Sequence, residues 1–251
     1  SLLCNGQSPK LFTTDKELSS SLINQIYQDR NGFIWIATED GLNRYDGAKF
    51  TIYKHEPNNE HSLAHNFVRT VFEDSKGHLL IGTYIGIQMY DPATDNFTPL
   101  AKLEDTGETL ESNINSFIER KNGEIWVSGN VLCKLDIKDH LLTVRKVDIA
   151  VTSPGSLFED KKQNVWMAKG EEGVYQLTPD NQLTLHLSKD NGYVKSICED
   201  QRGNIYVGSI RKGLFIYDKE RKTFVPIDLK EKGELPVCFL YSGIPNELYI
   251  G

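Results

Sequence analysis

The stretch Ile26–Tyr53, IYQDRNGFIWIATEDGLNRYDGAKFTIY, decides the fold because the chain repeats it. It returns as VFEDSKGHLLIGTYIGIQMYDPATDNFTP over 71–99 and as ICEDQRGNIYVGSIRKGLFIYDKERKTFVP over 197–226. Two weaker copies and one partial copy keep the same order of residue types, and they begin near Phe117, Leu157 and Val237. A sequence that repeats at a fixed period is typical of solenoids and propellers.

One bulky side chain marks the same place in every copy. The intervals between its successive occurrences are 45, 46, 40, 40 and 43 residues, counted from Trp35 through Leu80, Trp126, Trp166 and Tyr206 to Tyr249. A period in this range fits four short strands and their turns. The apolar runs are short, rich in β-branched and aromatic residues, and interrupted by Gly, Asp or Asn, which a helical repeat would not show. The sequence therefore predicts an all-β fold, a β-propeller of four-stranded antiparallel blades.

A turn between the first two strands of each copy supports this interpretation. Its first residue is Asp in most copies, and Gly follows three residues later, as in Asp29 and Gly32. Asp opens such a turn by bonding to its own backbone, and Gly supplies a positive φ. The third copy has Arg120 in place of Asp and the fourth has Gln163 in place of Gly. We expect the hairpin at Gln163 to be strained or closed differently.

The second strand of each copy is a continuous apolar run, which suits a strand covered on both faces by neighbouring blades. We therefore expect Trp35, Trp126 and Trp166 to lie in the core rather than to stack on a sugar. Blade-like units are expected near 19–55, 62–100, 110–147, 151–187 and 191–227, with a partial unit over 234–251.

Five full copies and a partial one predict an open arc of about five and a half blades, a fragment of a seven-bladed propeller. The N-terminal segment 1–18 contains Lys10-Leu11-Phe12-Thr13, which looks like a fourth strand and could close such a ring. A sheet edge left open near Gly251 invites pairing, so a homodimer is one expectation. The missing blades and a second propeller of a parent protein are further expected partners.

Composition excludes several classes of function. The formal net charge is −7, which argues against nucleic acid as a partner. No run of 18 apolar residues occurs, so the sequence contains no candidate membrane-spanning helix. The four cysteines show no spacing typical of metal ligands, and neither a zinc-protease motif, a phosphate loop nor a nucleophile elbow is present. We expect no catalytic residue, no metal and no cofactor.

Two runs carry a resemblance to a known family. His65–Asp74, HNFVRTVFED, and Gly32–Leu42, GFIWIATEDGL, followed by Tyr45-Asp46-Gly47, resemble the two-component regulator propeller repeat. The resemblance extends over nearly the whole chain and is strongest in the first, second and fifth copies. It implies the periplasmic sensor region of an inner-membrane hybrid two-component protein of Bacteroides and its relatives. In that family the propellers take part in recognising a glycan-derived oligosaccharide and signal to a histidine kinase.

Binding groups are expected on one face of the propeller, where the turns after the second strands meet the loops between blades. Amide, carboxylate and aromatic side chains there suit sugar hydroxyls. The candidate ligand-binding residues are Glu39, Asp40, His65, Asn66, Tyr84, Asn130 and Arg211, with Asn113 and Lys212 on the same rim. Two alternatives stay open: a propeller lyase that resembles the streptogramin-inactivating family, and a protein-interaction scaffold.

Overall fold

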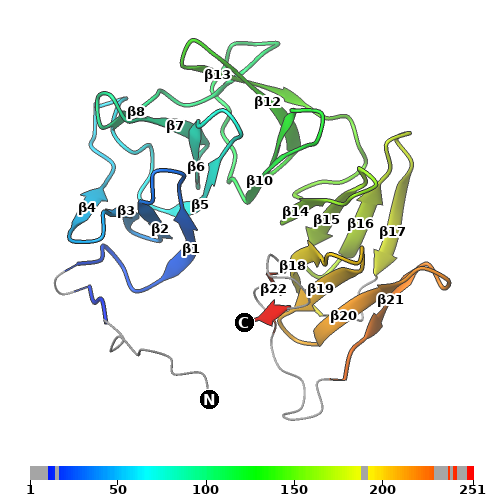
Figure 1. Cartoon of the computed structure of the whole chain (residues 1–251). Coiled ribbons are helices and arrows are strands. Elements are labelled where there is room, and N and C mark those ends of the chain that lie inside the picture. Colours follow the sequence, from blue (N-terminus) through cyan, green and yellow to red (C-terminus); the bar gives the residue numbers. More distant parts are fainter. Residues whose placement is uncertain (1–10, 15–16, 188–191, 229–236, 238–239, 242–247) are drawn as a thin grey trace.

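The chain folds into β-sheets that stand side by side around an arc (Figure 1). This computed structural model describes residues 11–14, 17–187, 192–228, 237, 240–241 and 248–251. Five of the sheets contain a blade of four antiparallel strands that follow one another in chain order, one of them with a short extra strand, and a sixth sheet has two described strands. The predicted all-β propeller of four-stranded blades is thus confirmed. No helix in the described part of the chain is long and apolar enough to cross a membrane.

Every blade runs from an innermost to an outermost strand. Blade 1 consists of β1 (Ile23–Gln28), β2 (Ile34–Thr38), β3 (Gly41–Tyr45) and β4 (Phe50–Tyr53). Blade 2 consists of β5 (Val68–Glu73), β6 (Leu79–Thr83), β7 (Ile87–Asp91) and β8 (Asn96–Phe97). Blade 3 consists of β10 (Ser116–Glu119), β11 (Ile125–Ser128), β12 (Leu132–Lys138) and β13 (Leu141–Lys146).

The last two full blades repeat this order. Blade 4 consists of β14 (Leu157–Glu159), β15 (Val165–Lys169), β16 (Gly173–Leu177) and β17 (Leu183–Leu187). Blade 5 consists of β18 (Val194–Glu199), β19 (Ile205–Ser209), β20 (Gly213–Asp218) and β21 (Thr223–Pro226). The two-stranded sheet pairs β22 (Leu240–Tyr241) with β23 (Tyr249–Ile250). Strands β1, β5, β10, β14 and β18 line the inner side of the arc (Figure 1).

Blade 3 has a fifth strand that the sequence did not predict. The short β9 (Lys102–Leu103) lies in the connection from blade 2 and pairs in parallel with β13, at the outer edge of the blade. A second bridge joins Lys102 to Thr109, so the connection doubles back on itself. An outermost strand that would otherwise be open is thereby partly covered.

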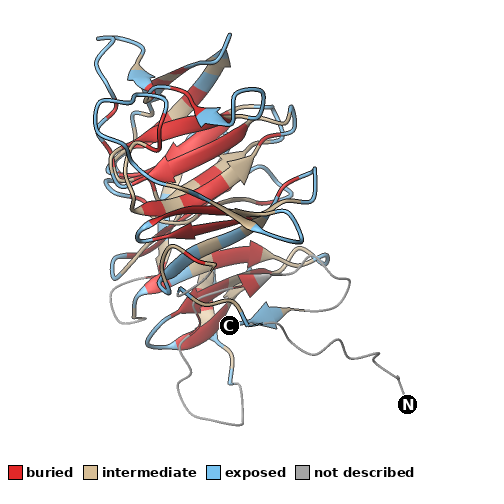
Figure 2. Cartoon of the chain, turned by 90° about the vertical axis from the view of Figure 1, so that its left-hand side faces the viewer, coloured by how far each residue is buried: buried red, intermediate tan, exposed pale blue. Residues whose placement is uncertain are grey.

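The core lies between neighbouring blades, where the buried strands in Figure 2 are stacked. Trp35 is fully buried and contacts Tyr90 of the next blade with ring centroids 4.9 Å apart. Trp166 likewise meets Tyr217 of the following blade at 5.1 Å. The prediction that Trp35, Trp126 and Trp166 are core residues is confirmed. The same position in the partial unit, Tyr249, is 45% exposed.

In blades 1, 2, 4 and 5 the turn between the first two strands is built around the carboxylate of one Asp. Asp29 Oδ1 accepts the backbone N–H groups of Asn31 and Phe33 at 3.0 and 2.9 Å, and its Oδ2 accepts Trp35 Nε1–H at 2.8 Å. Gly32 closes the turn with φ 88°. One side chain therefore fixes both the turn and the orientation of the core indole.

Gln163 keeps the same turn in blade 4. Its backbone N–H bonds to the carbonyl of Asp160 at 2.9 Å, as Gly32 does with Asp29. Its φ is 66°, a left-handed conformation in which a side chain is strained. The expected strain is confirmed, whereas the turn is not closed differently, because Asp160 Oδ1 accepts the N–H groups of Lys162 and Asn164 just as Asp29 does in blade 1.

Blade 3 rebuilds the turn without Asp. Asn122 Oδ1 accepts the N–H of Glu124 at 3.0 Å, and Glu124 Oε2 accepts Trp126 Nε1–H at 3.0 Å. Arg120, in the Asp position, lies over the Trp126 ring at 4.5 Å and pairs with Glu159 of blade 4. Two side chains thus divide the two tasks that one Asp performs elsewhere.

A second repeated contact joins the blades on the face that carries these turns, which we call the turn face. A backbone N–H just after the turn's first residue donates to a Glu at the end of the next blade's innermost strand. The four bonds are Arg30 to Glu73 at 2.8 Å, Ser75 to Glu119 at 2.6 Å, Lys121 to Glu159 at 2.7 Å and Lys161 to Glu199 at 3.0 Å. These carboxylates fix the angle between successive blades.

The segment before blade 1 packs against the blade. Phe12 contacts the rings of Tyr45 and Phe50 at 5.2 and 5.0 Å, and the Ser19 N–H donates to Asn43 Oδ1 at 2.9 Å. Residues 11–14 form no strand. Lys10 of the predicted closing strand lies outside the described residues.

Candidate functional site

The opposite face, which we call the loop face, brings the connections between blades next to the turns that follow the second strands. The Gly41 N–H donates to the Asn66 carbonyl at 2.7 Å, and Asn66 Nδ2–H donates to Asp40 Oδ1 at 3.1 Å. Lys54 pairs with Asp40 at 2.7 Å. Asp40 and Asn66 therefore meet, but their polar groups already have partners within the protein.

A group of aromatic residues lies beside them on the loop face. His65 and Phe67 precede β5, and Tyr84 follows β6; the Tyr84 ring lies 5.6 Å from His65 and 6.1 Å from Phe67. The guanidinium carbon of Arg69 lies 5.5 Å from the centre of the Phe67 ring. We call these four residues, together with Asn113, the Tyr84 patch.

Asn113 joins the patch through the backbone on either side of it. The Ile114 N–H donates to the Thr83 carbonyl at 3.0 Å, and the Ser112 N–H donates to the Ile85 carbonyl at 3.3 Å. These two bonds place Asn113 opposite Tyr84. The patch therefore spans the junction between blades 2 and 3.

Two buried polar atoms of the patch lack hydrogen-bond partners. They are Arg69 Nε, a donor, and Asn113 Oδ1, an acceptor. Leaving such an atom unsatisfied costs about 1–3 kcal/mol. A ligand that offers both an acceptor and a donor would recover that free energy if the Arg69 and Asn113 side chains turned towards it on binding.

Tyr84 adds an exposed aromatic ring to the patch, and His65 adds a hydrogen-bond donor. Tyr84 is 53% exposed, an unusual exposure for a large aromatic residue in this structure. His65 Nδ1 accepts the Phe67 N–H at 2.9 Å, so the neutral ring carries its proton on Nε2 as a donor. An aromatic face beside hydrogen-bonding groups of both kinds suits a ligand with one apolar side and several hydroxyls.

The other predicted residues lie elsewhere on the loop face. Arg211 pairs with Glu171 across blades 4 and 5 at 3.0 Å, and both side chains are mostly exposed. Glu39 is exposed, and its backbone N–H bonds to the Leu22 carbonyl at 3.1 Å. Of the seven candidates, the structure brings His65 and Tyr84 into the patch and places Asp40 and Asn66 next to it.

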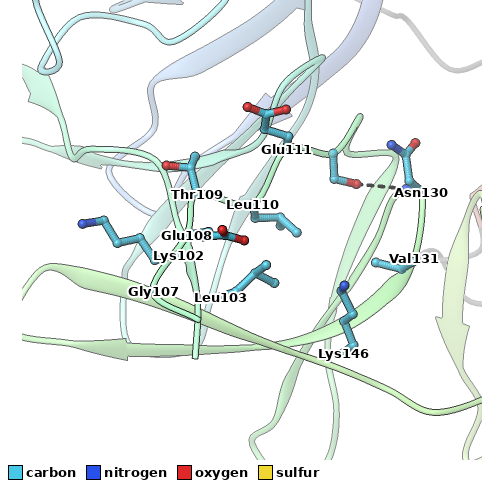
Figure 3. A pocket seen from close by; sticks show the side chains of 11 residues that line it. Lys102, Leu103, Gly107, Glu108, Thr109, Leu110, Glu111, Asn130, Val131 and Lys146 are labelled. Carbon is cyan, nitrogen blue, oxygen red and sulfur yellow. Dashed lines mark hydrogen bonds between the residues drawn. The ribbon is translucent and has the colours of Figure 1, made fainter. Parts of the chain in front are cut away.

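Asn130 lines a separate cleft between the β9 connection and blade 3 (Figure 3). The cleft has a volume of about 730 Å³, and Leu103 and Leu110 lie in its middle, between Glu108 and Lys146. The Asn130 N–H donates to the Ser112 hydroxyl at 2.9 Å, which is drawn as a dashed line. The cleft offers charges of both signs around an apolar floor, without the orphaned buried atoms of the patch.

Sequence reasoning missed Phe67 and Arg69. Both stand in a run that the repeat itself explains, so neither was singled out. A signal was nevertheless present: where blade 2 has Arg69, blades 1 and 3 have Asn24 and Asn115 at the matching position. No group of three or more potential metal-binding side chains occurs in the described part of the chain.

Comparison with known proteins finds similarity in the same segments that repeat within the chain. The sequence pattern of the family described as "Two component regulator propeller" matches residues 17–40, 62–84 and 188–211. A 55-residue stretch is 42% identical to "Histidine kinase P4" of Formosa agariphila. This stretch makes up 22% of this chain and 4% of that protein.

Solved structures show the same fold. The extracellular domains of two putative hybrid two-component systems from B. thetaiotaomicron match 98% and 96% of this chain, with TM-scores of 0.77 and 0.64 and 18% identity. The chain spans 36% and 40% of their lengths. Virginiamycin B lyase from Staphylococcus aureus matches 94% of this chain with 12% identity and a TM-score of 0.69, over 80% of its own length. The chain is therefore a β-propeller, and the resemblance found in the sequence is confirmed in the three stretches that match the two-component regulator propeller pattern.

Proposed function

We propose that this chain is a ligand-recognising module of an extracytoplasmic sensor that signals to a histidine kinase, and that its ligand is an oligosaccharide derived from a glycan. The repeat family and the likeness to sensor ectodomains support the sensor role. The Tyr84 patch supports the class of ligand, because a sugar presents an apolar ring face together with hydroxyl groups that both donate and accept.

The single observation that carries the proposal is the pairing of an exposed aromatic ring with two unsatisfied buried atoms, Arg69 Nε and Asn113 Oδ1. A surface that only joined blades would satisfy these atoms internally. The likeness to a lyase concerns the fold alone at 12% identity. We therefore favour recognition over catalysis.

Calorimetric titration of the chain with a panel of plant and host oligosaccharides tests the proposal. We expect at least one oligosaccharide to bind, and Tyr84→Ala to weaken that binding about tenfold, because a stacked aromatic contact is lost. Leu141→Ala is the control, since Leu141 is 55% exposed and lies at the β12–β13 turn of blade 3. Failure of every oligosaccharide to bind, or turnover of a streptogramin by the chain, would overturn the proposal.

A further inference from the structure

One position recurs near the start of every innermost strand, at the loop face. We call these five residues the inner rim: Asn24, Arg69, Asn115, Gly155 and Lys195. They occupy equivalent places because each stands five residues before the first residue of its blade's turn. The inner rim borders the inner side of the arc, where a ligand could contact several blades together (Figure 1).

Asparagine on the inner rim has a structural task. Asn24 Nδ2–H donates to the Val68 carbonyl of blade 2 at 2.7 Å, and Asn115 Nδ2–H donates to the Pro154 carbonyl of blade 4 at 3.0 Å. Val68 and Pro154 are equivalent residues of their blades. The amide thus links one innermost strand to the next.

Arg69 does not make this link. Its Nε is buried without a hydrogen-bond partner, and the side chain lies over the Phe67 ring instead. Arg69 and Asn24 stand at equivalent shifts in strand pairing, between Val68 and Thr70 and between Ile23 and Gln25, so the difference lies in the side chain and not in the backbone. Blade 2 therefore replaces a structural amide with a cation that is directed into the Tyr84 patch.

Lys195 repeats part of this arrangement in blade 5. It also stands at a shift in pairing, between Val194 and Ser196, and its side chain is exposed. Within the described residues, neither Arg69 nor Lys195 forms an ion pair. The inner rim contains no carboxylate, and the residues that follow its members are also uncharged, namely Gln25, Thr70, Ser116, Ser156 and Ser196. The charged residues of the inner rim are thus all positive, and Asp40, the carboxylate next to the Tyr84 patch, is already paired with Lys54.

We infer that the inner rim selects an anionic oligosaccharide, with Arg69 as the main contact to a carboxylate or sulfate group and Lys195 as a second contact. This inference rests on the proposed function and narrows its class of ligand. Guanidinium groups bind both anions through paired N–H donors, and an aromatic ring beside the guanidinium can stack on the sugar that carries the charge. An unpaired cation with an orphaned donor has most to gain from such a ligand.

The test compares matched ligands and matched variants in calorimetric titrations. The probes are uronic-acid oligosaccharides with their methyl esters, and sulfated disaccharides with their desulfated forms. We expect an acidic form to bind at least tenfold more tightly than its neutral counterpart. Arg69→Asn should abolish most of that preference, and Lys195→Asn should reduce it less.

Arg69→Asn is chosen because Asn is the native residue at this position in blades 1 and 3, so the variant should fold and regain the link between blades. Lys76→Asn is the control: it removes the same charge from an exposed residue on the turn face. Equal binding of acidic and neutral forms, or unchanged preference in Arg69→Asn, would overturn the inference and leave the proposed function intact. Binding of no oligosaccharide at all would overturn both.

Discussion

The two faces of the propeller differ in how closely the blades resemble one another. On the turn face, the same carboxylate turn and the same Glu contact recur from blade to blade, and blade 3 preserves the geometry even after losing its Asp. On the loop face, equivalent positions carry different side chains, and Arg69 does not make the hydrogen bond to the next blade that Asn24 makes. The turn face therefore maintains the architecture, whereas the loop face is where this chain departs from its own repeat and where binding is expected.

Removing a turn carboxylate should have the largest effect on stability. Asp160 accepts four hydrogen bonds, from the Lys162 and Asn164 N–H groups, Asn164 Nδ2 and Trp166 Nε1. Asp160→Ala leaves these donors without partners, and those of Asn164 and Trp166 are buried, so we expect a loss of about 3 kcal/mol in the free energy of unfolding. Urea denaturation measures this.

The matched change in blade 3 is Asn122→Ala, which removes a single bond to the Glu124 N–H. We expect this variant to lose about 0.5–1.5 kcal/mol, because the two tasks are divided there. Equal losses of unfolding free energy in Asp160→Ala and Asn122→Ala would show that sharing the turn contacts between two side chains does not make blade 3 more tolerant of substitution.

Acid should weaken blade 3 through Glu124. Burial acts to raise the pKa of this carboxyl, but hydrogen bonds led by the one from Lys134 outweigh it and lower the pKa to about 2. A depressed pKa in the folded state stabilises the protein above the unfolded-state pKa, and the effect is lost as the pH falls from about 4.5 towards 2. We expect about 1–2 kcal/mol, after allowance for solvent screening of this partly exposed group.

The measurement is the difference in unfolding free energy between wild type and Glu124→Gln across this pH range. The wild type should be the more stable at pH 6, and the difference should narrow as the pH falls to 3. A constant difference would mean that Glu124 stabilises the blade through packing rather than through charge.

The sequence predicted the parts of the fold that depend on local chemistry. An Asp followed by Gly three residues later specifies a turn by itself, and the apolar run after it specifies a buried strand, so Trp35 and Trp166 could be assigned to the core. The division of tasks between Asn122 and Glu124 could not be predicted, because neither residue stands where the repeat has its Asp. Strand β9 was missed because its two residues carry no periodic signal.

The candidate site was predicted only as a face. His65 and Tyr84 were chosen by residue type and position, and their contact depends on two loops that are distant in the repeat. Arg69 has a role that only its neighbours define: its position calls for an amide that reaches the next blade, and the orphaned Nε shows that this contact is missing. A departure from an internal repeat is therefore a more useful pointer to binding than the residue type alone.

The smallest expected change in unfolding free energy concerns the turn of blade 4, where Gln163 adopts a strained left-handed conformation. Gln163 has φ 66°, while Gly203 at the same place in blade 5 has φ 78°. Gln163→Gly should raise the free energy of unfolding by about 0.5 kcal/mol, since relief of the left-handed strain exceeds the added entropy of the unfolded chain. Gly203→Gln should lower it by about 1 kcal/mol, because no atom other than Glu199 Oε1 lies within 4 Å of a Cβ there, so φ alone sets the cost. Urea denaturation of both variants decides the matter: if Gln163→Gly is destabilising, the side chain of Gln163 has a task of its own, and the turn face is less uniform than the repeat suggests.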